Sequence, residues 1–178
     1  MRYLAFFLLC VSSAFAAGEL SGRRAPGFAL MDVTTFKYHD PADYRGKVLI
    51  VEIMQSTCPH CAVFAQVLEK AKAKYGDRIA VLSITNPPDN QTTVAEYRRK
   101  NKVTAPVLYD CGQVAGSYLK ITPQNPSFNI PHVFLIDAQG MIRSDFGYGP
   151  LTKSIFEGDA IFAEIDKLLP GVPAGKKK

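Results

Sequence analysis

Hydrophobic residues in this chain fall into short apolar runs that alternate with longer segments of helical periodicity. Residues 48–54 and 79–85 are almost entirely apolar and rich in Val and Ile, which is typical of strands buried on both faces. An amphipathic segment follows each run, over residues 59–75 and about 92–101. Because strands that alternate with helices pair in parallel through crossovers, this pattern predicts an α/β domain.

Shorter elements complete the predicted domain, and no internal repeat or second domain is visible. In the first long helix, the apolar positions 63, 64, 67, 68 and 71 predict the buried face. The pattern also predicts a strand over 28–33 with a hairpin mate at 36–38, a turn or helix start at 40–44, a strand at 107–109, a helix capped by Asp110 and running to about 120, an antiparallel pair of strands at 132–137 and 141–148, and a final helix over 157–169.

The two ends of the chain differ from the rest. Residues 1–16 combine Arg2, an apolar segment too short to span a bilayer and a small-residue cleavage site at Ala14-Phe15-Ala16, which predicts a signal peptide. An uncleaved anchor is the alternative. We therefore expect a folded domain over residues 17–169, an extracytoplasmic location, periplasmic or secreted, and a disordered basic tail over residues 170–178.

The net charge of +5 adds little, because Lys176 to Lys178 contribute much of it. No basic stripe is interleaved with aromatic residues, so the sequence argues against nucleic-acid binding. We expect at most weak contact with an anionic membrane surface, and a monomer.

The candidate chemistry lies in Cys58-Pro59-His60-Cys61, where the first buried strand passes into the first long helix. Pro59 suits the first helical position. A helix N-terminus carries unpaired N–H groups and roughly half a positive charge, so it stabilises the thiolate of Cys58. A cationic His60 would add to that effect, and Cys61 lies one turn further on. This arrangement predicts disulfide exchange by Cys58 with Cys61 as the resolving thiol.

Other uses of these cysteines remain open. An inert structural disulfide is one, and a zinc site is another, although its further candidates Cys111, His39 and His132 are scattered along the sequence. We therefore predict no metal. Haem attachment requires His at position 62, which is Ala.

Strand, Cys-x-x-Cys and helix together resemble the thioredoxin superfamily. Residues 25–30 (Ala-Pro-Gly-Phe-Ala-Leu) and 44–48 (Tyr-Arg-Gly-Lys-Val) resemble the start of the extracytoplasmic TlpA/ResA-like branch, and residues 130–137 resemble its cis-proline strand. The likeness covers about residues 25–169. The chain departs from it at Thr57, where an aromatic residue is usual, and it contains no Trp. The dipeptide Pro59-His60 matches the DsbA oxidases instead.

The resemblance implies a thioredoxin-like fold with a central mixed sheet flanked by helices and an N-terminal β-hairpin. It also implies a cis bond between Ile130 and Pro131 beside the cysteines, with backbone groups that face a substrate. No cofactor is implied. The expected partners are protein thiols or disulfides and a redox partner that the sequence does not identify.

The expected function is a thiol–disulfide oxidoreductase. The scaffold favours a reductase or isomerase over an oxidase, although Pro59-His60 favours a stabilised thiolate and hence a stronger oxidant. A peroxidase of the related peroxiredoxin group is an alternative, but such proteins place Thr three residues before the nucleophile, where this chain has Gln55. A non-catalytic binding module with a structural disulfide is the third hypothesis.

Glu52 is the least expected residue, because every neighbour in its strand is apolar. A buried carboxyl should be protonated or paired. Strand alternation places it on the face of Ile50 and Met54. Thioredoxin and DsbA resemble this chain in having a buried acid there, so we expect Glu52 to accept a proton from Cys61; a purely structural carboxyl is the alternative. Cys111 is predicted to be an inert thiol or, at a helix start, a reactive one.

Overall fold

A computed structural model describes residues 20–169 of the protein. The predicted signal peptide, residues 1–16, and the predicted basic tail, residues 170–178, lie outside the described residues. The division of the chain at these boundaries therefore stays a prediction.

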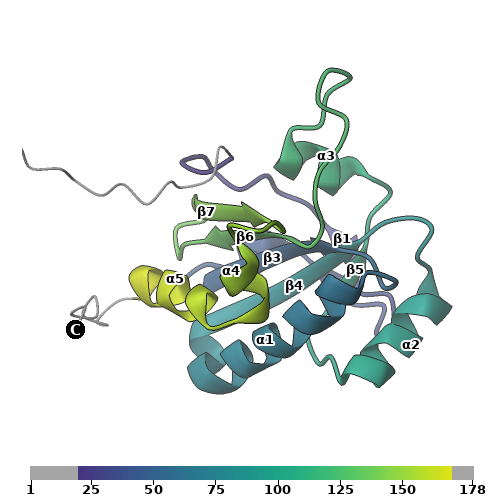
Figure 1. Ribbon diagram of the computed structural model, residues 1–178, viewed down its shortest axis with the longest axis horizontal. Coiled ribbons are helices and arrows are strands. Elements are labelled where there is room, and N and C mark those ends of the chain that lie inside the picture. Colours follow the sequence, from purple (N-terminus) through teal and green to yellow (C-terminus); the bar gives the residue numbers. More distant parts are fainter. Residues whose placement is uncertain (1–19, 170–178) are drawn as a thin grey trace, which may run out of the picture.

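The described residues form seven strands, five α-helices and two 3₁₀ helices (Figure 1). In chain order these are β1 (Leu30–Met31), β2 (Tyr38–His39), η1 (Pro41–Tyr44), β3 (Val48–Met54), α1 (Pro59–Tyr75), η2 (Gly76–Arg78), β4 (Ile79–Thr85), α2 (Gln91–Asn101), β5 (Val107–Tyr109), α3 (Gln113–Leu119), β6 (His132–Ile136), β7 (Ile142–Gly147), α4 (Lys153–Glu157) and α5 (Ala160–Leu168).

The centre of the molecule is a five-stranded mixed sheet in the order β5-β4-β3-β6-β7. Strand β3 pairs in parallel with β4 and antiparallel with β6, while β5 is parallel to β4 and β7 is antiparallel to β6. All seven residues of β3 are buried, as its apolar sequence predicted. The cysteine-bearing start of α1 therefore follows the central strand.

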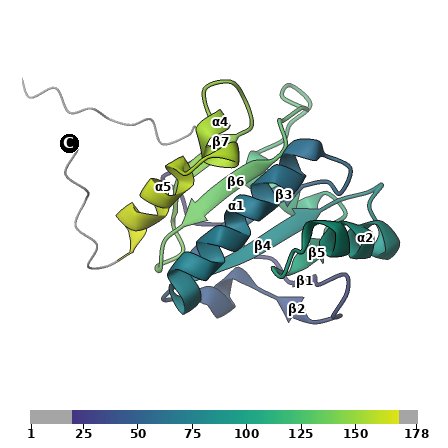
Figure 2. The same cartoon turned by 60° about the horizontal axis from the view of Figure 1, so that its bottom comes forward.

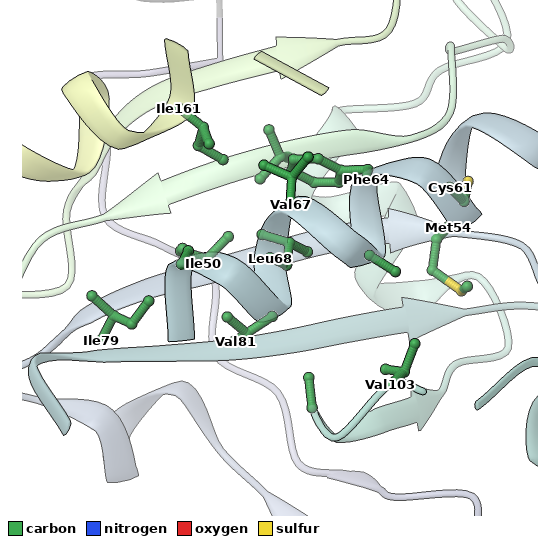
Figure 3. Close-up of a cluster of buried hydrophobic side chains, with 14 of the residues drawn as sticks. Ile50, Met54, Cys61, Phe64, Val67, Leu68, Ile79, Val81, Val103 and Ile161 are labelled. Carbon is green, nitrogen blue, oxygen red and sulfur yellow. The ribbon is translucent and has the colours of Figure 1, made fainter. Parts of the chain in front are cut away.

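Helices cover both faces of the sheet (Figures 1 and 2). Alternate residues of β3 contribute to different cores. Ile50 and Met54 pack with residues of α1, α4 and α5, whereas Val51 and Ile53 pack with residues of α3. Figure 3 shows part of the first core, with Cys61 at one end of the cluster near Met54. This is the α/β layer architecture that the sequence predicted, and the fold is thioredoxin-like.

The stretch before η1 contacts both outer strands of the sheet. Residues 22–25 pair with the start of β7, where the Gly22 N–H donates to the Ile142 carbonyl and the Ile142 N–H donates to the Arg23 carbonyl. Further along, the predicted hairpin β1–β2 forms, with two residues in each strand. Just after β1, Asp32 forms a β-bridge with Leu108 of β5.

Three local predictions were wrong. The final helix is divided into α4 and α5, because Gly158 adopts an extended backbone between them. Helix α3 begins only at Gln113, later than predicted, although the Asp110 carboxylate does accept the Gln113 N–H as the predicted cap. On α1, Val63 is 44% exposed, whereas the other predicted apolar positions of that helix are buried.

Among residues 20–169, no helix combines the length and the apolar character needed to cross a bilayer.

Candidate active site

Cys58 is the N-cap residue of α1, and Pro59 is its first helical residue. The Cys58 N–H donates to the Gln55 carbonyl at 3.1 Å, which closes a turn between β3 and the helix. The Cys61 N–H in turn points at the Cys58 sulfur, with 3.3 Å between nitrogen and Sγ. The first turn of the helix thus supplies a donor to the Cys58 sulfur, which favours the thiolate.

The two cysteines differ in exposure. Cys58 is partly buried, while Cys61 is fully buried, and both are free thiols. Burial, the nearby charge of Glu52 and the contact with Cys58 raise the pKa of the Cys61 thiol. The arrangement thus offers one accessible nucleophile and one protected thiol that needs a proton acceptor.

The bond between Ile130 and Pro131 is cis, as the resemblance implied. The Ile130 carbonyl oxygen lies 4.0 Å from the Cys58 sulfur. The structure therefore brings this loop to the accessible cysteine from a part of the chain far away in sequence.

Glu52 lies in the central strand β3 and is 1% exposed. Its Oε2 accepts a hydrogen bond from the Ser83 hydroxyl at 2.7 Å, while Oε1 makes no hydrogen bond. Burial raises the pKa of Glu52 to about 7, and the bond from Ser83 opposes that rise only in part. A carboxyl with this pKa, close enough for its charge to act on Cys61, has the properties of a proton acceptor near neutral pH.

The side chain of His60 is 45% exposed. Its ring stacks on Tyr148 with 4.0 Å between centroids, and Nδ1 lies 3.4 Å from Oε1 of Glu157. The Tyr148 hydroxyl donates to the same oxygen at 2.6 Å. That hydrogen bond raises the pKa of Tyr148 to about 12 and lowers the pKa of Glu157. His60 is therefore held by an aromatic face and a carboxylate.

Four residues of this site were not singled out as functional from the sequence: Tyr148, Glu157, Asp89 and Tyr97. The first two flank His60, and the Tyr97 hydroxyl donates to the Cys61 carbonyl at 3.0 Å. Asp89 binds Ser56 in the turn before Cys58. No local sequence pattern could have identified these four residues. They lie near the cysteines only because α2, the loop before it and the C-terminal elements pack there.

Two hollows adjoin Cys58 and Ile130. One, of about 450 Å³, lies between the start of α1 and α2, and Cys58, Pro59, Glu96 and Lys100 are among its lining residues. The other, of about 210 Å³, is lined by Ile53, Met54, Gln55, Asn86, Phe128 and Ile130.

The remaining candidate residues lie elsewhere. Cys111 is exposed in the loop before α3, and His39 contacts the Tyr44 hydroxyl. His132 is buried beside Asp145, with 3.4 Å between Nε2 and Oδ2. Residues 20–169 contain no group of three or more His, Cys, Asp or Glu placed to hold a metal ion.

Comparison with known proteins assigns the class. The AhpC/TSA family model matches residues 21–145, so the chain belongs to the AhpC/TSA family of thioredoxin-like proteins. Its fold and its Cys58–Cys61 spacing agree with that assignment.

Among individual relatives, the chain is similar to the thiol:disulfide interchange protein DsbE of Vibrio cholerae, at 29% identity over 128 residues, covering 70% of this chain and 63% of that protein. The match thus spans less than two thirds of the relative's length.

Two solved structures share the fold. A thiol:disulfide interchange protein of the thioredoxin family from Chlorobium tepidum has a TM-score of 0.59 at 24% identity, covering 76% of this chain and 91% of that one. A secreted disulfide oxidoreductase of Mycobacterium tuberculosis, homologous to DsbE, has a TM-score of 0.56 at 17% identity, covering 69% and 84%.

Proposed function

We propose that this protein is a thiol–disulfide oxidoreductase that exchanges disulfides with protein substrates through Cys58 and Cys61. One observation carries the proposal: a partly exposed Cys58 at a helix N-terminus lies next to a fully buried Cys61 and faces the Ile130 carbonyl. The similarity to a thiol:disulfide interchange protein supports the same activity.

The geometry supports a two-step exchange. The Cys58 thiolate attacks one sulfur of a substrate disulfide, the substrate S–S bond breaks, and its other sulfur leaves as a thiolate that takes up a proton. Cys61 then gives its proton to the Glu52 carboxylate and attacks the Cys58 sulfur. The mixed disulfide breaks, the second substrate sulfur leaves as a thiolate that takes up a proton from solvent, and Glu52 returns its own proton to solvent. The substrate thus leaves with two thiols, and the protein keeps the Cys58–Cys61 disulfide. The two electrons come from the protein dithiol, which a redox partner must restore.

The other predicted site residues have supporting roles in the exchange. Pro59 occupies the first helical position, where a backbone N–H would have no partner within the helix. His60 adds positive charge near the thiolate when it is protonated. The Ile130 carbonyl, which directly precedes Pro131, lies 4.0 Å from the Cys58 sulfur, and we propose that the backbone of Ile130 binds the substrate backbone beside the exchanging cysteine.

We propose a reductase or isomerase rather than an oxidase, acting outside the cytoplasm. The predicted signal peptide supports this location, as does the similarity to a secreted oxidoreductase. The buried carboxyl of Glu52 also favours reduction, because a negative charge near the dithiol disfavours its thiolate form.

Insulin reduction with dithiothreitol tests the activity, and the reduction potential tests its direction. We expect wild-type protein and Cys111→Ser to precipitate insulin equally well, and Cys58→Ser to lose the activity. A potential near the thioredoxin level of about −270 mV would indicate a reductant, whereas one near the DsbA level of about −120 mV would contradict this direction. Peroxide consumption without insulin reduction would favour the peroxidase alternative instead.

A further inference from the structure

A buried carboxylate from another loop accepts hydrogen bonds from the turn that carries Cys58. Asp89 lies in the loop between β4 and α2 and is 4% exposed. Its Oδ2 accepts a hydrogen bond from the Ser56 N–H at 2.8 Å, and its Oδ1 accepts one from the Ser56 hydroxyl. Both carboxylate oxygens therefore bind the same residue, two positions before the reactive cysteine.

Two threonines fix the carboxylate itself. The hydroxyl of Thr85, the last residue of β4, donates to Oδ2, and the hydroxyl of Thr93 in α2 donates to Oδ1 at 3.1 Å. Burial raises the pKa of Asp89, but the hydrogen bonds from Ser56, Thr85 and Thr93 together hold it below its ordinary value. The carboxylate is thus ionised and cannot rotate freely.

Ser56 links the Asp89 carboxylate to the turn that positions the Cys58 sulfur. It is the second residue of the turn that the Cys58 N–H closes onto the Gln55 carbonyl. The same turn places the Cys58 sulfur at the N-terminus of α1, where the Cys61 N–H donates to it. The family resemblance expects an aromatic residue before the first cysteine, but this chain has Thr57, so the turn has no large side chain there to fix it.

We propose that Asp89 is a positioning residue for Cys58: its bidentate hydrogen bonding to Ser56 holds the reactive sulfur at the helix N-terminus. This inference deepens the proposed function and rests on it for its biological meaning. The effect on the sulfur itself is a property of the folded chain that needs no substrate.

The test is the pH dependence of Cys58 alkylation by iodoacetamide, measured on reduced protein with Cys111 replaced by Ser. In Asp89→Asn, an NH₂ group meets one of the two Ser56 donors, so the turn loosens and the thiolate loses its helix donors. Because losing one hydrogen bond to the turn weakens the placement of the sulfur, we expect the alkylation rate at pH 7 to fall about three- to tenfold. The midpoint of the alkylation curve should move to higher pH, and the reduction potential should become more negative.

Asp32→Asn is the matched control. Asp32 is also a buried carboxylate, and it accepts hydrogen bonds from Thr34, Thr35 and Val107 without touching the turn. We expect this variant to lose stability and to keep the wild-type alkylation curve. If both variants shift the curve equally, or if Asp89→Asn leaves it unchanged, Asp89 has only a structural role and the proposal is wrong.

If Asp89→Asn does not fold, Ser56→Ala tests the same hydrogen bonding from the other partner. It removes the hydroxyl bond and keeps the backbone bond, so we expect a smaller shift in the same direction, and an unchanged curve would overturn the proposal. Alkylation does not require disulfide exchange. A protein that fails to reduce insulin but shows these shifts would therefore contradict the proposed function and leave the role of Asp89 intact.

Discussion

Glu52 is a carboxyl with one hydrogen-bonded oxygen and one buried oxygen without a hydrogen bond. A fully satisfied structural carboxyl would use both oxygens, because a buried acceptor without a partner costs about 1–3 kcal/mol. The free oxygen therefore suits a group that gains and loses a proton during a reaction.

Replacing Glu52 with Gln should separate the two steps of exchange. The first attack by Cys58 should stay nearly intact, while Cys61, whose thiol pKa is raised by burial, loses its proton acceptor. Quenched-flow sampling with a peptide disulfide should then show accumulated mixed disulfides. Resolution at the wild-type rate from pH 6 to 8 would reject the proton-transfer role.

The same substitution should change how stability depends on pH. The folded protein keeps the Glu52 proton up to about pH 7, while the unfolded chain loses it near its ordinary pKa of 4.5. Between these values the folded state binds more protons, so the free energy of unfolding should fall as pH rises, by about 3 kcal/mol in all. Urea denaturation at several pH values should show this fall in wild type and a flatter profile in Glu52→Gln. Parallel profiles would mean that Glu52 titrates as an ordinary carboxyl.

His60 should influence the potential of the cysteine pair. A protonated His60 would favour the thiolate, so we expect His60→Ala to make the disulfide form a weaker oxidant, by about 30 mV. Equilibration with glutathione measures this shift. His39→Ala is the control, since His39 contacts Tyr44 rather than the cysteine-bearing helix. Equal potentials for His60→Ala and wild type would leave His60 as a surface residue.

At the scale of single elements, local sequence patterns predicted the bounds of the strand and the helix that carry the candidate site. Strand β3 and helix α1 match the prediction, because an apolar run broken only by Glu52 and a Pro at the helix start are local signals. The division between α4 and α5 was missed, since the apolar periodicity continues across Gly158 while the backbone does not. Asp110 was correctly predicted as a cap, although helix α3 begins later than expected.

Asp110→Ala should destabilise the protein because it removes the hydrogen bonds to the first turn of α3. The Asp110 carboxylate accepts hydrogen bonds from the N–H groups of Gln113, Val114 and Ala115. Loss of a helix cap costs about 1–2 kcal/mol, which a urea titration resolves. Gln113→Ala, an exposed substitution in the same turn, should change stability by less than about 0.5 kcal/mol. Equal effects of the two substitutions would show that the cap contributes nothing.

At the scale of the whole molecule, the sequence predicted the layers better than the contacts between them. Alternating strands and helices predicted the α/β layers, the family resemblance implied the mixed sheet, and the cysteine motif together with the cis-proline loop that the resemblance implied accounts for half of the candidate site. The other half depends on long-range packing, as with Tyr148 and Glu157 against His60, or Asp89 against Ser56. Such pairs leave no periodic trace in a sequence.

The placement of the three thiols within residues 20–169 predicts one disulfide among them. Cys58 and Cys61 share one helix turn, while Cys111 is exposed in a different loop. Mass mapping of air-oxidised protein should find Cys58 linked to Cys61 and Cys111 fully alkylated. A peptide linked through Cys111 would instead require a three-cysteine mechanism or a covalent dimer.

The stretch before η1 has a consequence for behaviour at high concentration. By pairing with the start of β7 and bridging to β5, it occupies backbone groups on both outer strands of the sheet. Unpaired edge strands are templates for intermolecular association. A chain shortened to begin at residue 40 would expose those N–H and C=O groups on both sides of the sheet at once. We expect such a chain to associate edge to edge more readily than the intact protein as its concentration rises.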